Sequence, residues 1–399
     1  MSDSHGQFYV QKISPEGDFL WGEKGVLIGS GYGEAGDFYS CAVSDGSGGA
    51  IVIWLELLPQ AEGKLPSFKT HVARIDSEGD VEWQRDIPHV NQAIPDGSGG
   101  VIIAYDDRND NIYVLKIDDE GNLLWGQGGV SLNLSGNDSQ RDIVSDNSGG
   151  VIVVQQISGE DIIYAQRVDS GGNILWQRGG VQACVSPSEG AQVVSDAAGG
   201  GIIAYMRDIP CEDGRIGYCD SDIYAQRIDA EGNVLWGPDG VPICVGPSAP
   251  NTPKIVTDGA GGAIIFFVFI EDYTAFHAHR IDASGHELWN EEAELWGGDI
   301  VSDGSGGVIS VQYGGGGMSA GAQRLDATGK KLWGPDGIAL TLRDLHSSLA
   351  APDGCGGVLI SWSAVEFEGS KASEVSYYVQ RVDADGNLPW GDGGILLDP

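Results

Sequence analysis

A glycine-rich phrase that recurs about every 50 residues constrains this chain more than any other feature of its sequence. The phrase, Asp-Gly-Ser-Gly-Gly in three copies and slightly varied in the others, is followed by a short apolar run and occurs seven times in the 399 residues. Its copies begin at Asp45, Asp96, Asp146, Asp196, Asp258, Asp303 and Asp353. A period of this length, built from strand-like pieces, is typical of a propeller or a solenoid. The repeat therefore predicts an architecture before it predicts any activity.

A second phrase lies between the glycine-rich turns and ends in a tryptophan. It reads as a strand, an Asp-x-x-Gly turn and a returning strand, which is the pattern of a hairpin with glycine in the left-handed position. The tryptophan recurs at Trp21, Trp83, Trp125, Trp176, Trp236, Trp289, Trp333 and Trp390. Each repeat then holds four antiparallel strands, expected in the fourth interval at Ala191–Asp196, Gly201–Tyr205, Ile223–Asp229 and Asn233–Trp236. Nothing between them shows a sustained helical period, so we expect almost no helix.

The second strand of each repeat is apolar at successive positions, as in Val101 to Ala104. Alternation would indicate one solvated face, whereas an unbroken apolar run indicates a strand covered on both faces. Four-stranded sheets stacked around a ring provide such cover, and a solenoid usually has a much shorter repeat. We therefore predict an all-β fold, a β-propeller of four-stranded antiparallel blades.

The number of blades follows from the repeats, with one complication. Seven full repeats span approximately residues 41–390, whereas an eighth tryptophan hairpin stands alone at residues 8–26. We favour seven blades, with eight as the alternative, and expect the N-terminal hairpin at or near the ring closure, either beside the last blade or as an incomplete eighth one. No linker or low-complexity tract marks a second domain, so residues 1–399 are predicted to form a single propeller domain.

Charge narrows the classes of partner. The chain has 22 basic and 58 acidic residues, a formal net charge of −36. Eight of the basic residues recur at one place on the third strand, where pairing with a repeated aspartate or carbonyl is expected: Lys12, Arg74, Lys116, Arg167, Arg227, Arg280, Arg324 and Arg381. The remaining surface is then still more acidic, which disfavours nucleic acids and anionic lipid as partners. No apolar run approaches the roughly 18 residues of a membrane helix, and no signal peptide is visible at the start.

Three local patterns resemble metal or disulfide sites. The turns Asp383–Asn387 and Asp118–Asn122 look like parts of a calcium loop. They offer two or three oxygen ligands where calcium takes six or more, so plain hairpin turns are favoured and no cofactor is expected, with calcium as a weak alternative. His277 and His279 share one side of a strand and either bind a metal or pack. Cys211 and Cys219 flank a short insertion that a disulfide would close in an oxidising compartment.

The repeat phrases resemble those of two groups of proteins. The run from Asp326 to Trp333 is similar to the tryptophan-docking repeat of quinoprotein-type propellers, in which the tryptophan wedges between neighbouring blades. The longer phrase from Asp222 to Gly237, with the glycine-rich turn, resembles repeats of large bacterial secreted or surface proteins of unassigned role. The quinone enzymes have adjacent cysteines and a calcium-ligand set at the cofactor, which this chain lacks, so their activity is not carried over.

A function is expected where the repeats differ, since variable loops on a rigid scaffold are the usual binding sites. The long variable segments are residues 55–70, 206–221, 270–275 and 363–376. Aromatic residues end the second strand in five repeats, and charged residues lie close to several of them. These aromatics either pack between blades or, beside carboxylates, hold a sugar or a basic peptide. The candidate ligand-binding residues are Trp54, Tyr105, Asp107, Arg108, Tyr205, Asp208, Asp272 and Trp362.

Two classes of function remain open. The favoured one is a non-enzymatic binding or assembly module, an acidic scaffold that presents its variable loops to a protein or carbohydrate partner. The alternative is a polysaccharide lyase or hydrolase with acid–base carboxylates on the same face, although no single pair of acids can be selected. An extracellular or cell-surface location is suspected, with the cytoplasm as the alternative, and the sequence leaves the oligomeric state open.

Overall fold

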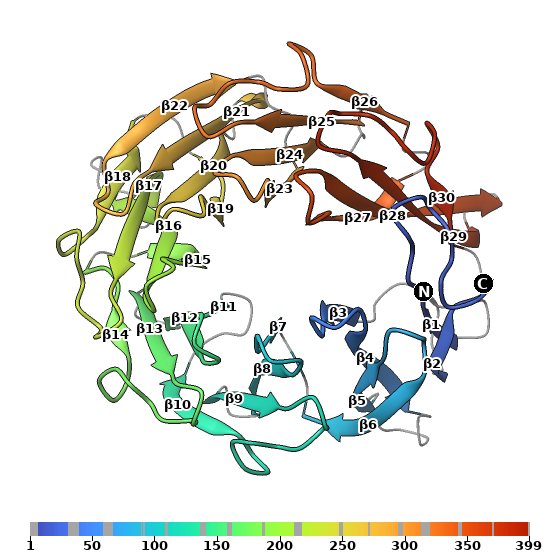
Figure 1. Ribbon diagram of the computed structural model, residues 1–399. Coiled ribbons are helices and arrows are strands. Elements are labelled where there is room, and N and C mark those ends of the chain that lie inside the picture. Colours follow the sequence, from blue (N-terminus) through green and yellow to red (C-terminus); the bar gives the residue numbers. More distant parts are fainter. Residues whose placement is uncertain are drawn as a thin grey trace.

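The protein is a ring of β-sheets whose first strands surround the centre (Figure 1). The computed structural model describes residues 7–30, 40–58, 67–88, 90, 92–107, 111–135, 141–157, 162–185, 188–210, 218–246, 250–269, 272–293, 298–312, 320–341, 345–368 and 371–397. These residues form seven four-stranded antiparallel sheets and one two-stranded sheet, and none of them lies in a helix. They therefore include no helix that could cross a membrane. The predicted all-β propeller with seven blades is confirmed.

Each blade consists of four consecutive strands in chain order, from the centre of the ring outwards. Blade 1 contains β3 (Ser40–Ser44), β4 (Ala50–Leu58), β5 (Ser67–Ile75) and β6 (Val81–Ile87). Blade 2 contains β7 (Gln92–Pro95), β8 (Val101–Asp106), β9 (Asn111–Ile117) and β10 (Val130–Ser135). Blade 3 contains β11 (Arg141–Ser145), β12 (Val151–Ile157), β13 (Ile162–Val168) and β14 (Val181–Gln182). Blade 4 contains β15 (Ser188–Ser195), β16 (Gly201–Pro210), β17 (Tyr218–Ile228) and β18 (Val241–Cys244).

The remaining strands complete the ring and leave one hairpin over. Blade 5 contains β19 (Lys254–Thr257), β20 (Ala263–Phe269), β21 (Asp272–Ile281) and β22 (Glu287–Ala293). Blade 6 contains β23 (Gly298–Ser302), β24 (Val308–Gln312), β25 (Ala320–Leu325) and β26 (Ile338–Leu340). Blade 7 contains β27 (Leu345–Pro352), β28 (Val358–Glu368), β29 (Lys371–Val382) and β30 (Ile395–Leu396). The N-terminal hairpin is the two-stranded sheet of β1 (Gln7–Val10) and β2 (Val26–Ser30).

The fourth strand lies later in the chain than expected in most blades. In blade 4 the segment Asn233–Trp236 makes only one isolated bridge, and the fourth strand follows at β18. A glycine-rich turn separates the two: Gly240 has a φ of +77°, and a Cβ there would collide with the carbonyl of Ala225. Only glycine fits such a position. In blades 1 and 5 no glycine follows the tryptophan, and it lies within the fourth strand itself.

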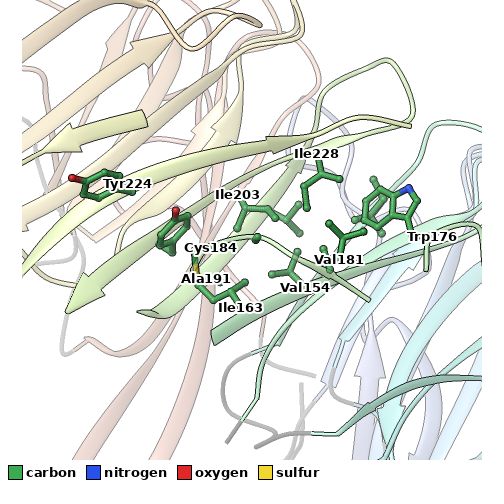
Figure 2. Packing of buried hydrophobic residues seen from close by; sticks show 14 residues of the cluster. Val154, Ile163, Trp176, Val181, Cys184, Ala191, Ile203, Tyr224 and Ile228 are labelled. Atoms are coloured by element: carbon green, nitrogen blue, oxygen red, sulfur yellow. The ribbon is translucent and has the colours of Figure 1, made fainter. Parts of the chain in front are cut away.

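The hydrophobic core lies between neighbouring blades rather than within one of them. Figure 2 shows the cluster between blades 3 and 4, in which Val154 and Trp176 face Ile203 and Ile228. Second-strand residues such as Ile152 and Ile203 are at most 1% exposed. Full cover on both faces explains why this strand is apolar at every position.

The repeated aspartate organises the glycine-rich turn of each blade. The Oδ1 atom of Asp196 accepts the backbone N–H groups of Ala198 and Gly200, both at 2.8 Å. Its Oδ2 accepts two bonds from the guanidinium of Arg227, at 3.0 and 2.8 Å. In blade 1, burial raises the pKa of the equivalent Asp45, but hydrogen bonds led by those from Ser47 outweigh burial and lower it to about 2. The expected pairing of the third-strand bases with a repeated aspartate is thus present in every full blade.

A shared carbonyl ties blade 3 to blade 4. Arg167 Nη1 and Trp176 Nε1 of blade 3 both donate to the carbonyl of Ala230 in blade 4, each at 3.1 Å. The N-terminal hairpin takes part in the same series: Trp390 of blade 7 donates to Pro15, and Trp21 of the hairpin donates to Ser77 of blade 1, both at 3.1 Å. Blade 7 has its own four strands, so the hairpin supplies only the third and fourth strands of an eighth position. This explains why the tryptophan phrase recurs eight times whereas the ring has seven full blades.

Candidate functional site

The chain order of the strands gives the propeller two unlike faces. Both kinds of repeated turn, between the first and second strands and between the third and fourth, lie at one end of each blade, here called the turn face. The loops between second and third strands and the blade-to-blade connections lie at the other end, here called the loop face. The four variable segments singled out in the sequence belong to the loop face. Each of them falls in part outside the described residues.

On the turn face, the repeated aspartates already accept hydrogen bonds from within the protein. Its aspartates accept backbone N–H groups and third-strand bases, as described for Asp196. In the third-to-fourth turn of blade 7, Asp383 Oδ1 accepts the N–H groups of Asp385 and Asn387, and its Oδ2 accepts the side-chain amide of Asn387. Both carboxylate oxygens are therefore engaged inside the turn.

The second-strand aromatics among the predicted site residues are buried in the described structure. Trp54, Tyr105, Tyr205 and Trp362 are at most 6% exposed. Each ring stacks on the residue directly opposite it on the third strand, at centroid distances of 5.1 to 6.5 Å, and the partners are His71, Tyr113, Tyr224 and Tyr378. The hydroxyl of Tyr105 donates to Gly128, and burial raises its pKa. These contacts agree with the alternative in which the aromatics are packing residues of the propeller.

Two charged members of the set, Asp107 and Asp208, lie in the described structure and belong to different blades. Asp107 accepts the backbone and side-chain amide of Asn111 at 2.9 to 3.1 Å, and so holds the ends of the loop between β8 and β9. Asp208, in blade 4, accepts the hydroxyl of Ser221 at 3.3 Å. Arg108 lies outside the described residues, and so does the side chain of Asp272. Of these charged residues, the structure describes the side chains of Asp107 in blade 2 and Asp208 in blade 4, which belong to different loops.

One cluster at the loop-face end of blade 1 was not found by sequence reasoning. His71 Nε2 lies 2.7 Å from Glu56 Oε2, and His71 Nδ1 lies 2.9 Å from Asp86 Oδ1. The hydrogen bond from Lys69 to Asp86, at 2.8 Å, lowers the pKa of that carboxyl. The four residues sit on one face of β4, β5 and β6 because cross-strand partners share a face. The pairing register, which sequence alone does not give, was the missing signal.

A second group of polar residues lies on the inner strands of neighbouring blades. Asp142 of blade 3 accepts the amide of Gln92 from blade 2 at 3.0 Å and the backbone N–H of Val193 from blade 4 at 2.8 Å. Burial raises the pKa of Asp142 to about 6, against the lowering effect of these hydrogen bonds. Asp299 of blade 6 occupies the same place and accepts a bond from Lys254 of blade 5 at 2.6 Å. These contacts join the blades around the centre of the ring.

The described residues contain no group of three or more histidine, cysteine or acidic side chains that could hold a metal. His277 stacks on Phe267 at 5.3 Å, and His279 lies 3.0 Å from Glu287, so each histidine has its own contact. Cys211 and the side chain of Cys219 lie outside the described residues.

Comparison with known proteins supports the architecture. No protein-family model and no curated protein matches this sequence. Among solved structures, the chain is similar to the BP39L lectin from Burkholderia pseudomallei, with a TM-score of 0.53 and 11% identity over 90% of this chain and 98% of the lectin. It is also similar to a polysaccharide lyase described as a PL25 ulvan lyase, with a TM-score of 0.48 and 12% identity over 97% and 92% of the two chains. At this identity, the lectin shares the fold and nothing further follows.

Proposed function

We propose that this protein is a non-catalytic binding or assembly module that presents its loop face to a protein or carbohydrate partner. One observation carries the proposal: the repeated polar residues are used to tie blades together, and the segments that differ between repeats emerge at the opposite face. Arg227, for example, donates hydrogen bonds to the carboxylate of Asp196 and to the carbonyl of Ala283 in the next blade. A rigid scaffold with variable loops at one face is the usual design of a binding protein.

The chemistry of the loop face supports a partner with hydroxyl or basic groups. Asp107 and Asp208 border the loops of blades 2 and 4, and the chain has a net charge of −36. Such a surface attracts cationic segments and repels phosphate backbones and anionic lipid. The lectin that shares this fold is a carbohydrate-binding propeller by its name, which makes a sugar the first ligand class to test.

The same proposal includes a class of blade and a location. The contacts of Trp176 and Trp390 with carbonyls of the next position in the ring support a tryptophan-docking architecture similar to that of quinoprotein-type propellers, without their activity. We further propose an extracellular or cell-surface location, on the resemblance of the repeats to those of bacterial surface proteins. Calcium is not part of the proposal.

A lyase or hydrolase remains the second candidate, because Glu56, His71 and Asp86 bring acid and base groups together. The geometry argues against catalysis there. A general base must direct an unengaged atom at the substrate, whereas Nε2 of His71 is hydrogen-bonded to Glu56 and the side chain is only 8% exposed. Trp54 covers one face of the ring. The cluster is better explained as a polar contact that holds the end of blade 1.

A binding screen with matched variants tests the proposed function. The intact protein would be applied to a glycan array and to a panel of basic peptides, and the best ligand would be titrated against Asp107→Asn, Asp208→Asn and Glu231→Gln. Glu231 is exposed on the turn face and serves as the control. We expect at least one loop-face variant to weaken binding severalfold and the control to leave it unchanged. Release of unsaturated sugars from a polysaccharide, or sensitivity to Glu231→Gln alone, would overturn the proposal.

A further inference from the structure

Lys12, on the N-terminal hairpin, lacks a partner that its counterparts have. In each full blade the third-strand base lies 2.8 to 3.2 Å from the aspartate of its own glycine-rich turn, and that carboxylate is at most 2% exposed. Lys116 is the closest comparison: its Nζ donates to Gly149 of the next blade at 2.8 Å and lies 3.2 Å from Asp96. Lys12 donates to the matching carbonyl of Gly48 at 2.6 Å. Among the described residues it meets no carboxylate.

The reason is that the hairpin supplies only the outer half of a blade. Its β1 and β2 correspond to third and fourth strands, and among the described residues no first or second strand pairs with them. The outer half is nevertheless seated as in a full blade, because Phe8, Trp21 and Ile28 pack against Val52 and Trp54 of blade 1. In the described part of the chain, the position between blades 7 and 1 thus has two strands where every other position has four.

Blade 7 shows the consequence on the face that it turns toward this position. In blade 1, Ile51 and Ile53 are fully buried because the second strand of blade 2 covers them. The corresponding residues of blade 7, Leu359 and Ser361, are only half-buried. On the inner strand beside them, Leu349 is 69% exposed. An apolar sheet face that is buried in one blade is therefore left accessible in blade 7.

We propose that the inner half of this eighth position is a docking site for a β-hairpin of another polypeptide that carries an aspartate at the start of its turn. An apolar second strand would cover Leu349 and Leu359, as blade 2 covers blade 1. The turn aspartate would pair with Lys12, as Asp96 pairs with Lys116. Ser361 stands where the other blades have an apolar residue, so the face tolerates water and docking would be reversible. This site is separate from the loop face and does not depend on the function proposed there.

A labelled peptide with the sequence of residues 299–312, which forms the β23–β24 hairpin in blade 6, provides the probe. Its binding to the full-length protein would be followed by fluorescence anisotropy. We expect saturable binding that falls at least tenfold with Lys12→Glu on the protein or Asp303→Lys on the peptide, and that recovers when the two changes are combined. Lys24→Glu, an exposed change of the same charge on the same hairpin, is the matched control and should have no effect. Leu349→Asp should also weaken binding, without affecting the fold, because its side chain lies largely in solvent.

Each other outcome counts against the proposal. Absence of saturable binding would overturn it, and so would binding that tolerates both Lys12→Glu and Leu349→Asp. Light scattering over a range of protein concentrations tests whether the protein forms a dimer through this site. A dimer that Lys12→Glu dissociates would identify a second copy of this chain as the occupant and would replace the proposed partner. Binding of a loop-face ligand should be the same with and without Lys12→Glu.

Discussion

Trp390 of the last blade donates its indole N–H to the carbonyl oxygen of Pro15 at 3.1 Å, although 375 positions separate the two residues in the chain. Arg381 donates to the same carbonyl at 3.2 Å. Blades 3 and 4 are tied by the equivalent pair of donors, Arg167 and Trp176, so the ring closes by one more copy of an internal contact. The N-terminal hairpin is therefore part of the scaffold, and the strength of these ties should decide the stability of the ring.

Replacement of an interblade tryptophan by alanine should be strongly destabilising where the ring is buried. Trp176 is 4% exposed and donates to Ala230, so Trp176→Ala should lower the free energy of unfolding by roughly 3–5 kcal/mol, as other large core truncations do. Trp390 is more exposed, and Trp390→Ala should cost about half as much. Urea denaturation followed by circular dichroism measures both. Leu235→Ala is the control because that side chain is 45% exposed; a loss below about 1 kcal/mol for Trp176→Ala would contradict the assigned role.

A backbone substitution in one turn should stabilise the protein. Ala197 has a φ of +61° where five other blades place glycine in the same turn. The left-handed region costs an ordinary residue about 1–2 kcal/mol, part of which glycine loses again to its greater freedom when unfolded. Ala197→Gly should therefore raise stability by about 0.5–1 kcal/mol. Asn147→Gly is the matched control and should bring no such gain, because Asn147 has a φ of +58°, asparagine tolerates this region and its side-chain amide donates to Ser195. A destabilising effect of Ala197→Gly would contradict the prediction.

The turns, the blade order and the interblade cores could be predicted from the sequence because each depends on short-range chemistry. An aspartate followed by glycines fixes its own turn, and an unbroken apolar run such as Val101 to Ala104 implies cover on both faces. The place of the fourth strand depends on Gly240 and its equivalents, whose close approach to a neighbouring carbonyl becomes visible only in three dimensions.

The candidate site was less accessible to sequence reasoning. Trp54 and Tyr105 look alike whether they pack or bind, since an aromatic residue at a strand end serves both purposes. The cluster around His71 depends on which residues of β4, β5 and β6 stand opposite one another, and a shift of one residue would send the imidazole to the other face. Charge pairing was predictable for the full blades because base and aspartate recur together. The lone position of Lys12 could be recognised only once the hairpin was placed in the ring.

The carboxyl of Asp142 should make stability depend on pH in the mildly acidic range. Its pKa is raised from the ordinary 3.8 to about 6, chiefly by burial, so the folded state holds a proton that the unfolded state releases. Stability should therefore increase as the pH falls from 7 through 6 toward 4, by on the order of 2 kcal/mol after allowance for partial solvent contact. Denaturant midpoints measured between pH 4 and 7 would show whether stability rises in this way.

Asp142→Asn isolates that contribution from the general relief of repulsion among the acids. The amide keeps an acceptor for Val193 and gains a donor for Gln92, whose side-chain oxygen has no hydrogen-bond partner among the described residues. The variant should be more stable than the parent at pH 7 and equal to it near pH 4. Glu231→Gln, an exposed change on the turn face, controls for the loss of one charge. Parallel pH profiles for the parent and Asp142→Asn would show that Asp142 does not titrate in this range.

The acidic surface should make the melting temperature rise with salt. The net charge is −36. The third-strand bases pair with the turn aspartates and therefore leave most of the other acidic residues without a neutralising partner charge. Self-repulsion of this size is screened as the Debye length falls from about 30 Å at 0.01 M to about 3 Å at 1 M. Melting in sodium chloride over that range would measure the effect, and an unchanged melting temperature would mean that the acids are already compensated.

Calcium at constant ionic strength should add nothing to this gain. A calcium site needs six or more oxygen ligands, whereas in the turn from Asp383 to Asn387 both carboxylate oxygens of Asp383 already accept hydrogen bonds. Binding would require these bonds to break. Melts with millimolar calcium and with a chelator should therefore coincide at matched ionic strength. A calcium-dependent rise that Asp383→Asn abolishes would instead identify this turn as a cation site and restore the calcium-loop interpretation of its sequence.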